Sequence, residues 1–415
     1  MFSQFLLTSS VFMALTQVAT PFPHSSNSDK GCQNGRAIYM ISNNADNAVV
    51  AVPIASDGTL LVDRGTTTAT GGVGETGITK ATNQSAGPDG LFSQSSLTIA
   101  GNNIFAVNPG SNTVSMFAID QRDPTKLTLV GNPAALLGDF PVTVAASDQN
   151  RLVCVGASGA RAGVSCASFS AQTGIGAMDG LRSFALNQTT PPEGPLNTVS
   201  EVFFSGDEST LFTTVKGDPT VNNTGFLASF PVQNARTTCR AASVGKQATR
   251  NSPNGTAVLF GSKPIPGSSN LFVTDASFGA AVLGISSAAD IAAGEPGVVT
   301  LGRGVIDGQS ATCWATISPA TNTAFVTDVG VNRLVEMSLT DASIQGQPID
   351  LSANGDPGLI DLVAAGSFIY ALSPGNGTTE AAVTVLNALT RAQVQHAQLT
   401  SLGLNKNAQG LAVLV

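Results

Sequence analysis

The sequence predicts an all-β fold, and three observations support this prediction. A short run of β-branched and aromatic residues recurs seven times along the 415 residues, at separations of 45 to 66 residues. Each run is flanked by polar turns and further alternating strands, while helical periodicity is weak throughout. Strand, turn and strand at this spacing are typical of radially repeated four-stranded antiparallel blades, so we expect a seven-bladed β-propeller.

The repeated run starts at an apolar residue that is usually followed by an aromatic one. The first positions of the runs are Ile38, Ile104, Leu152, Leu211, Leu271, Ala324 and Ile369. The aromatic followers are Tyr39, Phe105, Phe212, Phe272, Phe325 and Tyr370, while the third run has Val153. The intervals between runs leave room for four strands with turns and variable loops.

The first blade lacks the strand that precedes the run in the other blades, because the chain enters it almost directly at residues 36–41. The C-terminal segment QGLAVLV, residues 409–415, matches the missing strand type. We therefore expect this segment to complete the first blade and close the ring, which removes a sheet edge that would template aggregation. The propeller domain is then expected over residues 32–415.

The N-terminus is typical of an exported protein. An apolar stretch from Phe5 to Leu15 is followed by small residues and a Pro/Ser segment. The stretch is shorter than the roughly 20 apolar residues that span a bilayer and fits a secretory signal. We predict a signal peptide over residues 1–20, a Pro/Ser-rich leader over 21–31, and a protein secreted to the extracellular space or cell wall.

N-glycosylation sequons agree with export, because N-x-[ST] is the acceptor site in secreted proteins. The sequon asparagines are Asn83, Asn187, Asn222, Asn254 and Asn376. They lie in segments that we expect to be loops, and glycans there would offset the scarcity of surface charge.

Cysteine placement also favours an oxidising compartment. Cys154 and Cys166 lie on two short strands, LVCVG and GVSCASF, around a Gly-rich turn. With the turn centred near Ala160 the two residues face each other, so we expect a cross-strand disulfide. The other cysteines form an odd set whose pairing stays open, and no Cys/His spacing indicates a metal site. They are Cys32, Cys239 and Cys313.

Charge excludes two classes of partner. Only 11 % of the residues are charged and the net charge is −8, whereas a typical soluble domain has about 25 % charged residues. The chain has no Lys/Arg cluster, so we expect neither nucleic acid nor a membrane as a partner. We expect a monomer that binds a small polar molecule, a glycan or a host surface.

A long Gly/Thr-rich connection, residues 65–90, separates the first two blades. Within it Gly72, Gly74 and Gly77 spell G-x-G-x-x-G, a dinucleotide fingerprint that requires a following helix. No helical pattern follows, so we expect no cofactor. We interpret the segment as a mobile loop that lies over one face of the propeller.

Polar residues end most of the repeated runs, and in a propeller such strand ends gather around the central channel. They are Asn43, Asn108, Lys216, Asp275, Asp328 and Ser373. Together they would form a ring able to bind a polar ligand, or each would only terminate its strand by hydrogen bonding to nearby backbone. Asp275 and Asp328 are also candidate calcium ligands, although the dense carboxylate spacing of a dedicated loop is absent.

A few isolated residues have two interpretations. Arg303 and Asp307 lie in the connection that enters the sixth blade, where they reach the channel or are solvated. Trp314 is interpreted as core or channel lining, and His396 as a surface loop residue. Because no G-x-S-x-G elbow is present, a Ser-His-Asp site is hard to assemble.

Three stretches carry a family resemblance. They are PDGLFSQSSLTIAGNNIFAVNPGSNTVSMFAI, VFFSGDESTLFTTVKG and ATCWATISPATNTAFVTDVGVNRLVEMSL. They resemble the lactonase-type seven-bladed propellers and, more narrowly, secreted fungal proteins named after 3-carboxy-cis,cis-muconate cyclase. The resemblance covers residues 32–415, and it implies cofactor-independent lactonisation of a muconate or hydrolysis of a sugar-acid lactone.

The chain departs from that family at the expected reaction site. The family's fourth blade carries an Arg-His pair before an F-S-P-D-G turn and a Glu at the end of the next strand. Here Ser200 and Glu201 occupy the Arg-His positions and Lys216 the Glu position, and the third blade lacks the family's further His. Loss of Arg removes a bidentate carboxylate clamp, and Lys inverts the charge at an acid/base position. Glu201 and Lys216 are then expected to pair with each other as a structural ion pair.

These departures favour a non-catalytic extracellular protein that binds a ligand or a surface. The alternative is a cofactor-independent lactonising enzyme or lactone hydrolase in which other residues take the lost roles. The candidates for those roles are Glu201, Lys216, Asp275, Asp328 and Arg303.

Overall fold

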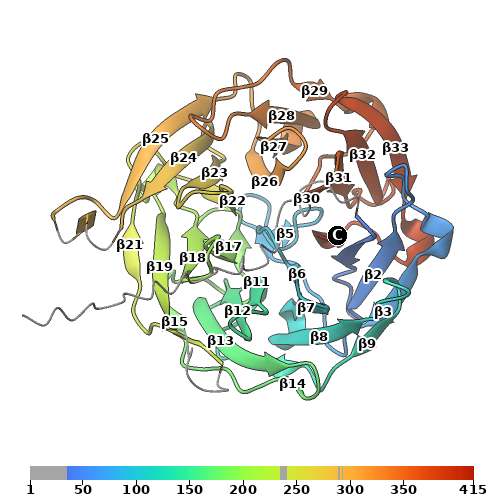
Figure 1. Cartoon of the computed structure of the whole chain (residues 1–415), viewed down its shortest axis with the longest axis horizontal. Helices are drawn as coiled ribbons and strands as arrows, with labels where there is room; N and C mark the ends of the chain where they lie inside the picture. The colour runs from blue at the N-terminus through green and yellow to red at the C-terminus, as the bar shows by residue number, and fades with distance from the viewer. Residues whose placement is uncertain (1–34, 234–240, 288–289, 292) are drawn as a thin grey trace, which may run out of the picture.

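The computed structural model describes residues 35–233, 241–287, 290–291 and 293–415, which form propeller-like antiparallel sheets around a central axis (Figure 1). Each radial sheet has four or five strands and contains one repeated run as its second strand from the axis. We call each such sheet a blade and number it by its repeated run. The predicted all-β fold of mainly four-stranded antiparallel sheets is confirmed.

The innermost strand of each blade lies beside the innermost strands of its neighbours, so these strands enclose the axis. In ring order they are β34 (Gln409–Leu414), β6 (Leu97–Ala100), β11 (Pro141–Ser147), β17 (Val199–Phe204), β22 (Leu259–Pro264), β26 (Thr312–Ser318) and β30 (Leu362–Ala365). The second strands are β1 (Ala37–Ile41), β7 (Asn103–Asn108), β12 (Leu152–Ala157), β18 (Thr210–Val215), β23 (Leu271–Asp275), β27 (Thr323–Asp328) and β31 (Phe368–Ser373).

The third and outer strands complete each blade. The third strands are β2 (Ala48–Pro53), β8 (Thr113–Ile119), β13 (Gly163–Ser170), β19 (Phe226–Gln233), β24 (Gly279–Ile285), β28 (Arg333–Met337) and β32 (Ala382–Asn387). The outer strands are β3 (Thr66–Ala69), β9 (Leu127–Leu129), β10 (Ala134–Ala135), β14 (Gly174–Ile175), β15 (Arg182–Ser183), β20 (Ser243–Val244), β21 (Thr249–Asn251), β25 (Val298–Val305), β29 (Ile349–Asp350) and β33 (Ala392–Gln398).

The C-terminal strand closes the ring as the sequence predicted. β34 pairs antiparallel with β1, and Ala37 lies opposite Leu414 while Ile41 lies opposite Gln409. Blade 1 therefore joins the first and last strands of the described chain, and its inner edge is covered. Leu411 of this strand is 4 % exposed, so the strand is also part of the core.

The aromatic residues of the repeated runs are buried in the blades. Tyr39 and Tyr370 are fully buried, and their hydroxyls donate to the carbonyls of Pro124 at 2.8 Å and Gly58 at 3.0 Å. Burial raises the pKa of both phenols. A buried hydroxyl without a partner is costly, so each tyrosine fits only where a neighbouring loop offers a carbonyl.

The predicted disulfide is present. Cys154 on β12 lies directly opposite Cys166 on β13, with 4.1 Å between their Cα atoms, and the two sulfurs are bonded. Cys313 is a buried free thiol. Cys32 and Cys239 lie outside the described residues, so the pairing of the remaining cysteines stays open.

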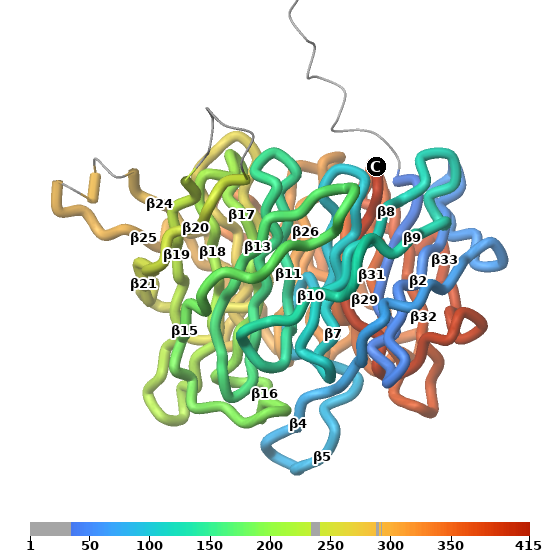
Figure 2. The backbone as a smooth tube through the Cα atoms, turned by 90° about the horizontal axis from the view of Figure 1, so that it is seen from below, coloured from blue at the N-terminus to red at the C-terminus, as the bar shows by residue number. Residues whose placement is uncertain are grey.

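The long connection between blades 1 and 2 folds over one face of the ring (Figure 2). β4 (Ile78–Thr79) and β5 (Gln84–Ser85) form a small hairpin, and β4 pairs parallel with β16 (Glu193–Gly194). We call residues 76–90 the lid. The sequence correctly placed this segment over a face, but its pairing with a distant connection makes it a hydrogen-bonded part of the fold and not the mobile loop that was expected.

Gly74 explains part of the glycine pattern at the base of the lid. A Cβ atom there would lie 2.3 Å from the backbone carbonyl carbon of Asn43. The glycine is therefore required by close backbone packing, and a strand, not a helix, follows the G-x-G-x-x-G motif.

The predicted signal peptide, leader and His24 lie outside the described residues. Among the residues that are described, no helix is both long and apolar enough to cross a bilayer.

Deletion of residues 409–415 is expected to prevent accumulation of soluble protein, because it leaves the inner edge of β1 unpaired. The measurement is the yield of soluble chain. Deletion of Val415 alone is the control, since this residue is 53 % exposed and lies outside β34. Soluble truncated protein that melts like the full chain would contradict ring closure by β34.

Replacing both Cys154 and Cys166 by Ser is expected to lower the free energy of unfolding by about 3 kcal/mol, because the crosslink closes a short loop. Urea unfolding of the oxidised protein and the double variant measures the difference. Cys313→Ala serves as a control that leaves the crosslink intact, and equal stability of the double variant and the oxidised protein would refute the estimate.

Candidate functional site in the central channel

A segment of blade 2 reaches across the axis and joins the inner strands of other blades. The backbone N–H of Gln94 donates to the carbonyl of Ser200 in blade 4 at 2.9 Å, and the Trp314 indole of blade 6 donates to the carbonyl of Ser93 at 2.9 Å. The N–H of Val144 in blade 3 donates to the carbonyl of Ser95 at 2.8 Å. Residues 93–95, which we call the crossing segment, thus connect four blades.

The side chain of Gln94 continues across the channel. Its Nε2 donates to the carbonyl of Ala315 at 2.9 Å and to Asp361 Oδ1 at 3.0 Å, and its Oε1 accepts from Ala315 N. A Cβ atom at Gly261 would lie 2.4 Å from this Oε1, so glycine is needed on the facing strand. The channel is therefore filled at this level by the protein's own backbone and amide side chain.

Lys216 is buried on the lid side of the crossing segment. Its Nζ donates to the carbonyl of Phe92 at 2.5 Å and to Ser200 Oγ at 3.2 Å, and it lies 4.4 Å from the ring centre of Phe260. Burial lowers the pKa of Lys216 to about 7, although the nearby carboxyl of Asp89 opposes the change. An ammonium that loses water without gaining a full ion pair is destabilised, which is the cause of the shift.

Asp89 is the acidic neighbour of Lys216 and comes from the end of the lid. Its Oδ1 accepts from the backbone N–H of Phe92 at 3.0 Å. Burial raises the pKa of Asp89 to about 6, while Lys216 and the Phe92 N–H act in the opposite direction. Burial therefore shifts the pKa values of the two groups in opposite directions, raising that of Asp89 and lowering that of Lys216.

Glu201 does not pair with Lys216, so the predicted ion pair is wrong. Its Oε1 lies 2.8 Å from Lys263 Nζ and accepts from Ser95 Oγ at 2.8 Å, and its Oε2 accepts from Ser262 N at 2.6 Å. Its cross-strand partner is Thr214, whereas Lys216 lies beyond the end of β18. A bulge in β17 between Val199 and Glu201 breaks the simple register on which the pairing relied.

Asp361 lies immediately before β30 and is 1 % exposed. It accepts hydrogen bonds from Gln94 Nε2, from Leu362 N at 2.9 Å and from Leu411 N at 3.0 Å. Burial raises the pKa of Asp361 to about 7, and Glu201 adds to the rise while Lys263 counters it. This carboxyl links the crossing segment, blade 7 and the closing strand.

Asp275 and Asp328 end their strands as hydrogen-bond acceptors in turns. Asp275 accepts from Ala257 N at 2.7 Å and from the Ser277 hydroxyl at 2.5 Å. Asp328 accepts from Ser310 N at 2.7 Å and pairs with Arg333 at 2.8 Å. Their oxygens are therefore held by neighbouring loops, and the described residues contain no cluster of three His, Cys, Asp or Glu arranged to hold a metal ion.

Arg303 lies away from the channel. It is an exposed residue of β25, an outer strand, and its guanidinium lies 4.0 Å from the ring centre of Phe278. Of its two interpretations, solvation agrees with this position, and the connection that enters blade 6 begins only after this outer strand. Asp307, in that connection, accepts from Arg333 through its backbone carbonyl at 3.0 Å.

The asparagines and the serine of the proposed ring are buried, and they lie at the ends of their strands or, for Asn43, just after the end of β1. Asn43 Nδ2 donates to the carbonyl of Glu75 at 2.8 Å, and Asn108 Oδ1 accepts from Asn47 at 2.9 Å. Both amides therefore connect turns of neighbouring segments. Ser373 ends β31 and is fully buried.

Trp314 and His396, which the sequence left as isolated residues, both lie on strands. Trp314 is 1 % exposed and packs edge-to-face on Phe260 with 4.8 Å between ring centres, as expected for a channel-lining residue. His396 lies on β33, not in a loop, and its Nε2 is 3.1 Å from Asp356 Oδ1.

Sequence reasoning missed Gln94, Asp89, Lys263 and Asp361. Asp89 and Asp361 each precede an innermost strand, in the stretches PDGLF and DPGLID, so a comparison of strand starts would have found them. Lys263 gave no such signal, because it lies near the end of β22. Its contact with Glu201 depends on the packing of two neighbouring innermost strands, β17 and β22.

Comparison with known proteins identifies the architecture. No protein-family model matches the chain, and no curated protein is detectably similar in sequence. Among solved structures, the periplasmic gluconolactonase PpgL of Pseudomonas aeruginosa is similar over 91 % of this chain and 99 % of its own, with a TM-score of 0.58 and 12 % identity. The chain has a β-propeller fold.

Two other solved structures show how broadly this fold is shared. A 6-phosphogluconolactonase candidate from Bacteroides fragilis is similar over 94 % of this chain and 99 % of its own, with a TM-score of 0.54 and 10 % identity. Hydrazine synthase of Kuenenia stuttgartiensis matches over 88 % of this chain and 99 % of its own, with a TM-score of 0.50 and 12 % identity. At such identities the likeness establishes the propeller fold alone.

The free energy of unfolding is expected to fall as the pH rises from about 4 to about 7. In the unfolded chain Asp361 loses its proton near pH 4, whereas in the folded protein it keeps the proton up to about pH 7. The unfolded state then binds fewer protons in this window, so stability is lost as the pH rises through it.

Urea unfolding at a series of pH values tests this dependence. Asp361→Asn is expected to flatten it, although Asp89 still contributes a fall in the same direction. Asp350→Asn is the control, since this exposed carboxyl has a lowered pKa. An unchanged pH dependence in Asp361→Asn would contradict the assignment.

Proposed function

We propose that this protein is a secreted, glycosylated, seven-bladed β-propeller of the lactonase type that acts as a non-catalytic extracellular binding protein. Each of the radial sheets around the axis corresponds to one repeated run, which supports the blade number. The five sequon asparagines are all exposed, and the cross-strand disulfide suits an oxidising compartment.

The burial and hydrogen bonding of Lys216 support the non-catalytic role most directly. This residue holds the position at which the resembling family has its catalytic Glu, yet it is 1 % exposed and bonds to the chain's own Phe92 carbonyl. A substrate at this point would have to displace Phe92, which lies between the lid and the crossing segment. Closing or opening a lactone needs access to the proton-transfer group, so burial of this kind opposes catalysis.

Charge at the neighbouring positions gives further support. Ser200 replaces the family's Arg, and its hydroxyl donates to the carbonyl of Leu259 at 2.8 Å. Lys263, the cation nearest to Glu201, is committed to that carboxylate. Among the described residues, both lysines of this site, Lys216 and Lys263, are therefore held by the protein's own groups, and the Arg that would bind a substrate carboxylate in a bidentate manner is replaced.

Lactone chemistry remains the second candidate function because of one observation. Lys216 and Asp89 have pKa values near 7 and 6, which is the range in which general acids and bases work best at neutral pH. In this alternative Lys216 would transfer the proton, and the lid would have to admit the substrate.

An activity assay separates the two functions. The purified protein is expected to show no turnover of 3-carboxymuconate or of a panel of sugar-acid lactones above the uncatalysed rate. Lys216→Met is expected to remain folded, because Met fills similar space without a charge. Lys126→Met, at an exposed position, is the matched control.

Turnover by the natural protein that is lost in Lys216→Met and kept in Lys126→Met would refute the binding role. That result would establish lactone chemistry as the function instead. Equal inactivity of all three proteins, with unchanged melting of the control, is the outcome that the proposal requires.

A further inference from the structure

The five sequons lie on one face of the ring, which is the lid face. Two kinds of connection emerge there: those between second and third strands, and those that lead from an outer strand to the next innermost strand. Because neighbouring strands of a blade are antiparallel, both kinds end on the same side. Asn222 and Asn376 lie in the first kind, Asn187 and Asn254 in the second, and Asn83 in the lid itself.

The opposite face carries no sequon among the described residues, and we call it the bare face. It is formed by the turns between innermost and second strands and by the connections from third to outer strands. The C-terminus lies on this side in Figure 2, and the lid lies on the other. Glycans attached at the sequons would leave this face open to a ligand.

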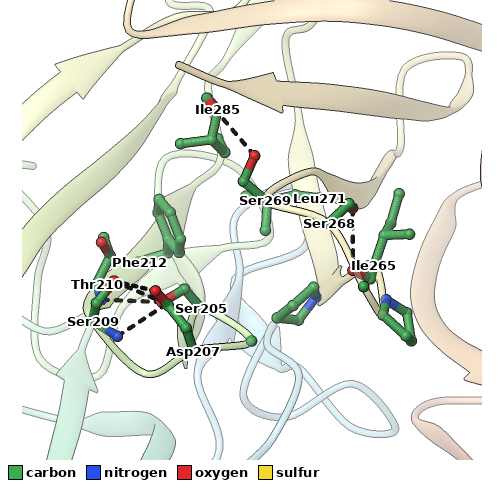
Figure 3. Close-up of a pocket in the computed structure, with 14 residues that line it drawn as sticks. Ser205, Asp207, Ser209, Thr210, Phe212, Ile265, Ser268, Ser269, Leu271 and Ile285 are labelled. Carbon is green, nitrogen blue, oxygen red and sulfur yellow. Dashed lines mark hydrogen bonds between the residues drawn. The ribbon is translucent and has the colours of Figure 1, made fainter. Parts of the chain in front are cut away.

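A pocket of about 700 Å³ opens on the bare face between blades 4 and 5 (Figure 3). One wall is the turn between β17 and β18, and the other is the turn between β22 and β23. Pro264, Pro266 and Ile285 supply accessible apolar surface in the pocket. The lining residues include no Lys, Arg or His.

The blade 4 wall presents hydrogen-bond acceptors. Ser205 Oγ donates to Asp207 Oδ1 at 2.7 Å, and Ser209 Oγ donates to the same carboxylate at 2.8 Å. These hydrogen bonds, together with the one from Ser209 N, lower the pKa of Asp207, so its carboxylate is charged at neutral pH. Asp207 itself is exposed to the pocket.

The serine hydroxyls of the blade 5 wall also donate their protons to groups of the protein itself. Ser268 Oγ donates to the carbonyl of Ile265 at 3.2 Å, and Ser269 Oγ donates to the carbonyl of Ile285 at 3.4 Å. A serine hydroxyl has one proton and two lone pairs. All four pocket serines therefore offer lone pairs, and not protons, to an incoming ligand.

We propose that this pocket binds a small organic cation: a primary ammonium group on a short hydrocarbon chain. The ammonium would donate to the Asp207 carboxylate and to serine lone pairs, and the hydrocarbon chain would cover the apolar surface of Pro264, Pro266 and Ile285. Acidic ligands are excluded because the pocket has a negative charge and no cation. This inference deepens the proposed binding function by naming a ligand class and a place.

The test uses n-hexylammonium as the probe, with 1-hexanol and hexanoate as neutral and anionic counterparts. Binding to the full glycosylated protein is measured by ligand-observed NMR titration at low salt. Hexylammonium is expected to bind, and hexanol and hexanoate to bind at least about tenfold more weakly, because a hydrogen bond to a charged group is the stronger kind. Equal binding of hexanol would overturn the proposal.

Variants locate the site. Asp207→Asn is expected to weaken hexylammonium binding about tenfold. Asp341→Asn is the matched control, because Asp341 also accepts from a serine N–H and hydroxyl, those of Ser343, in an exposed turn of the bare face outside the pocket. S269K, which places a cation in the pocket and keeps Asp207, is expected to abolish binding.

The outcomes separate this inference from the proposed function. Unchanged binding in Asp207→Asn and S269K, or an equal loss in Asp341→Asn, would overturn the pocket assignment while leaving a catalytically inactive binding protein in place. Turnover of a lactone that depends on Lys216 would refute the proposed function without affecting hexylammonium binding on the bare face.

Discussion

The hydrogen bonds of the Asp361 carboxyl hold together the parts of the chain on which the rest of the structure depends. One carboxyl accepts from the closing strand at Leu411, from its own blade at Leu362 and from the crossing segment at Gln94. Ring closure and channel filling are therefore one arrangement. A β-propeller removes its sheet edges only if the first and last strands meet, and this carboxyl lies where they do.

The same arrangement decides what the channel can do chemically. Lys216 is hydrogen-bonded to the carbonyl of Phe92, the residue that immediately precedes the crossing segment. Its depressed pKa results from burial, and perturbed pKa values arise in structural networks as well as in active sites. The chain therefore has a propeller fold whose centre is packed by its own residues at this level.

The two faces of the ring differ in a way that neither the fold nor the repeat requires. The lid and the sequons share one face, and the acceptor-lined pocket opens on the other. An antiparallel blade sends alternate connections to opposite ends, so sequence changes in one class of loop leave the other class unaffected. Propellers can therefore carry a covered face and a binding face on one scaffold.

The sequence by itself determined the repeated strands, the closing role of residues 409–415 and the Cys154–Cys166 crosslink, because each depends on local alternation or on a single strand pairing. It did not determine the partners of Glu201, the lid strand pairing or the place of Gln94. Those depend on a bulge in β17 and on contacts between residues more than a hundred positions apart. Only the closed ring brings such residues together, so tertiary structure alone decided that the centre is packed and not open.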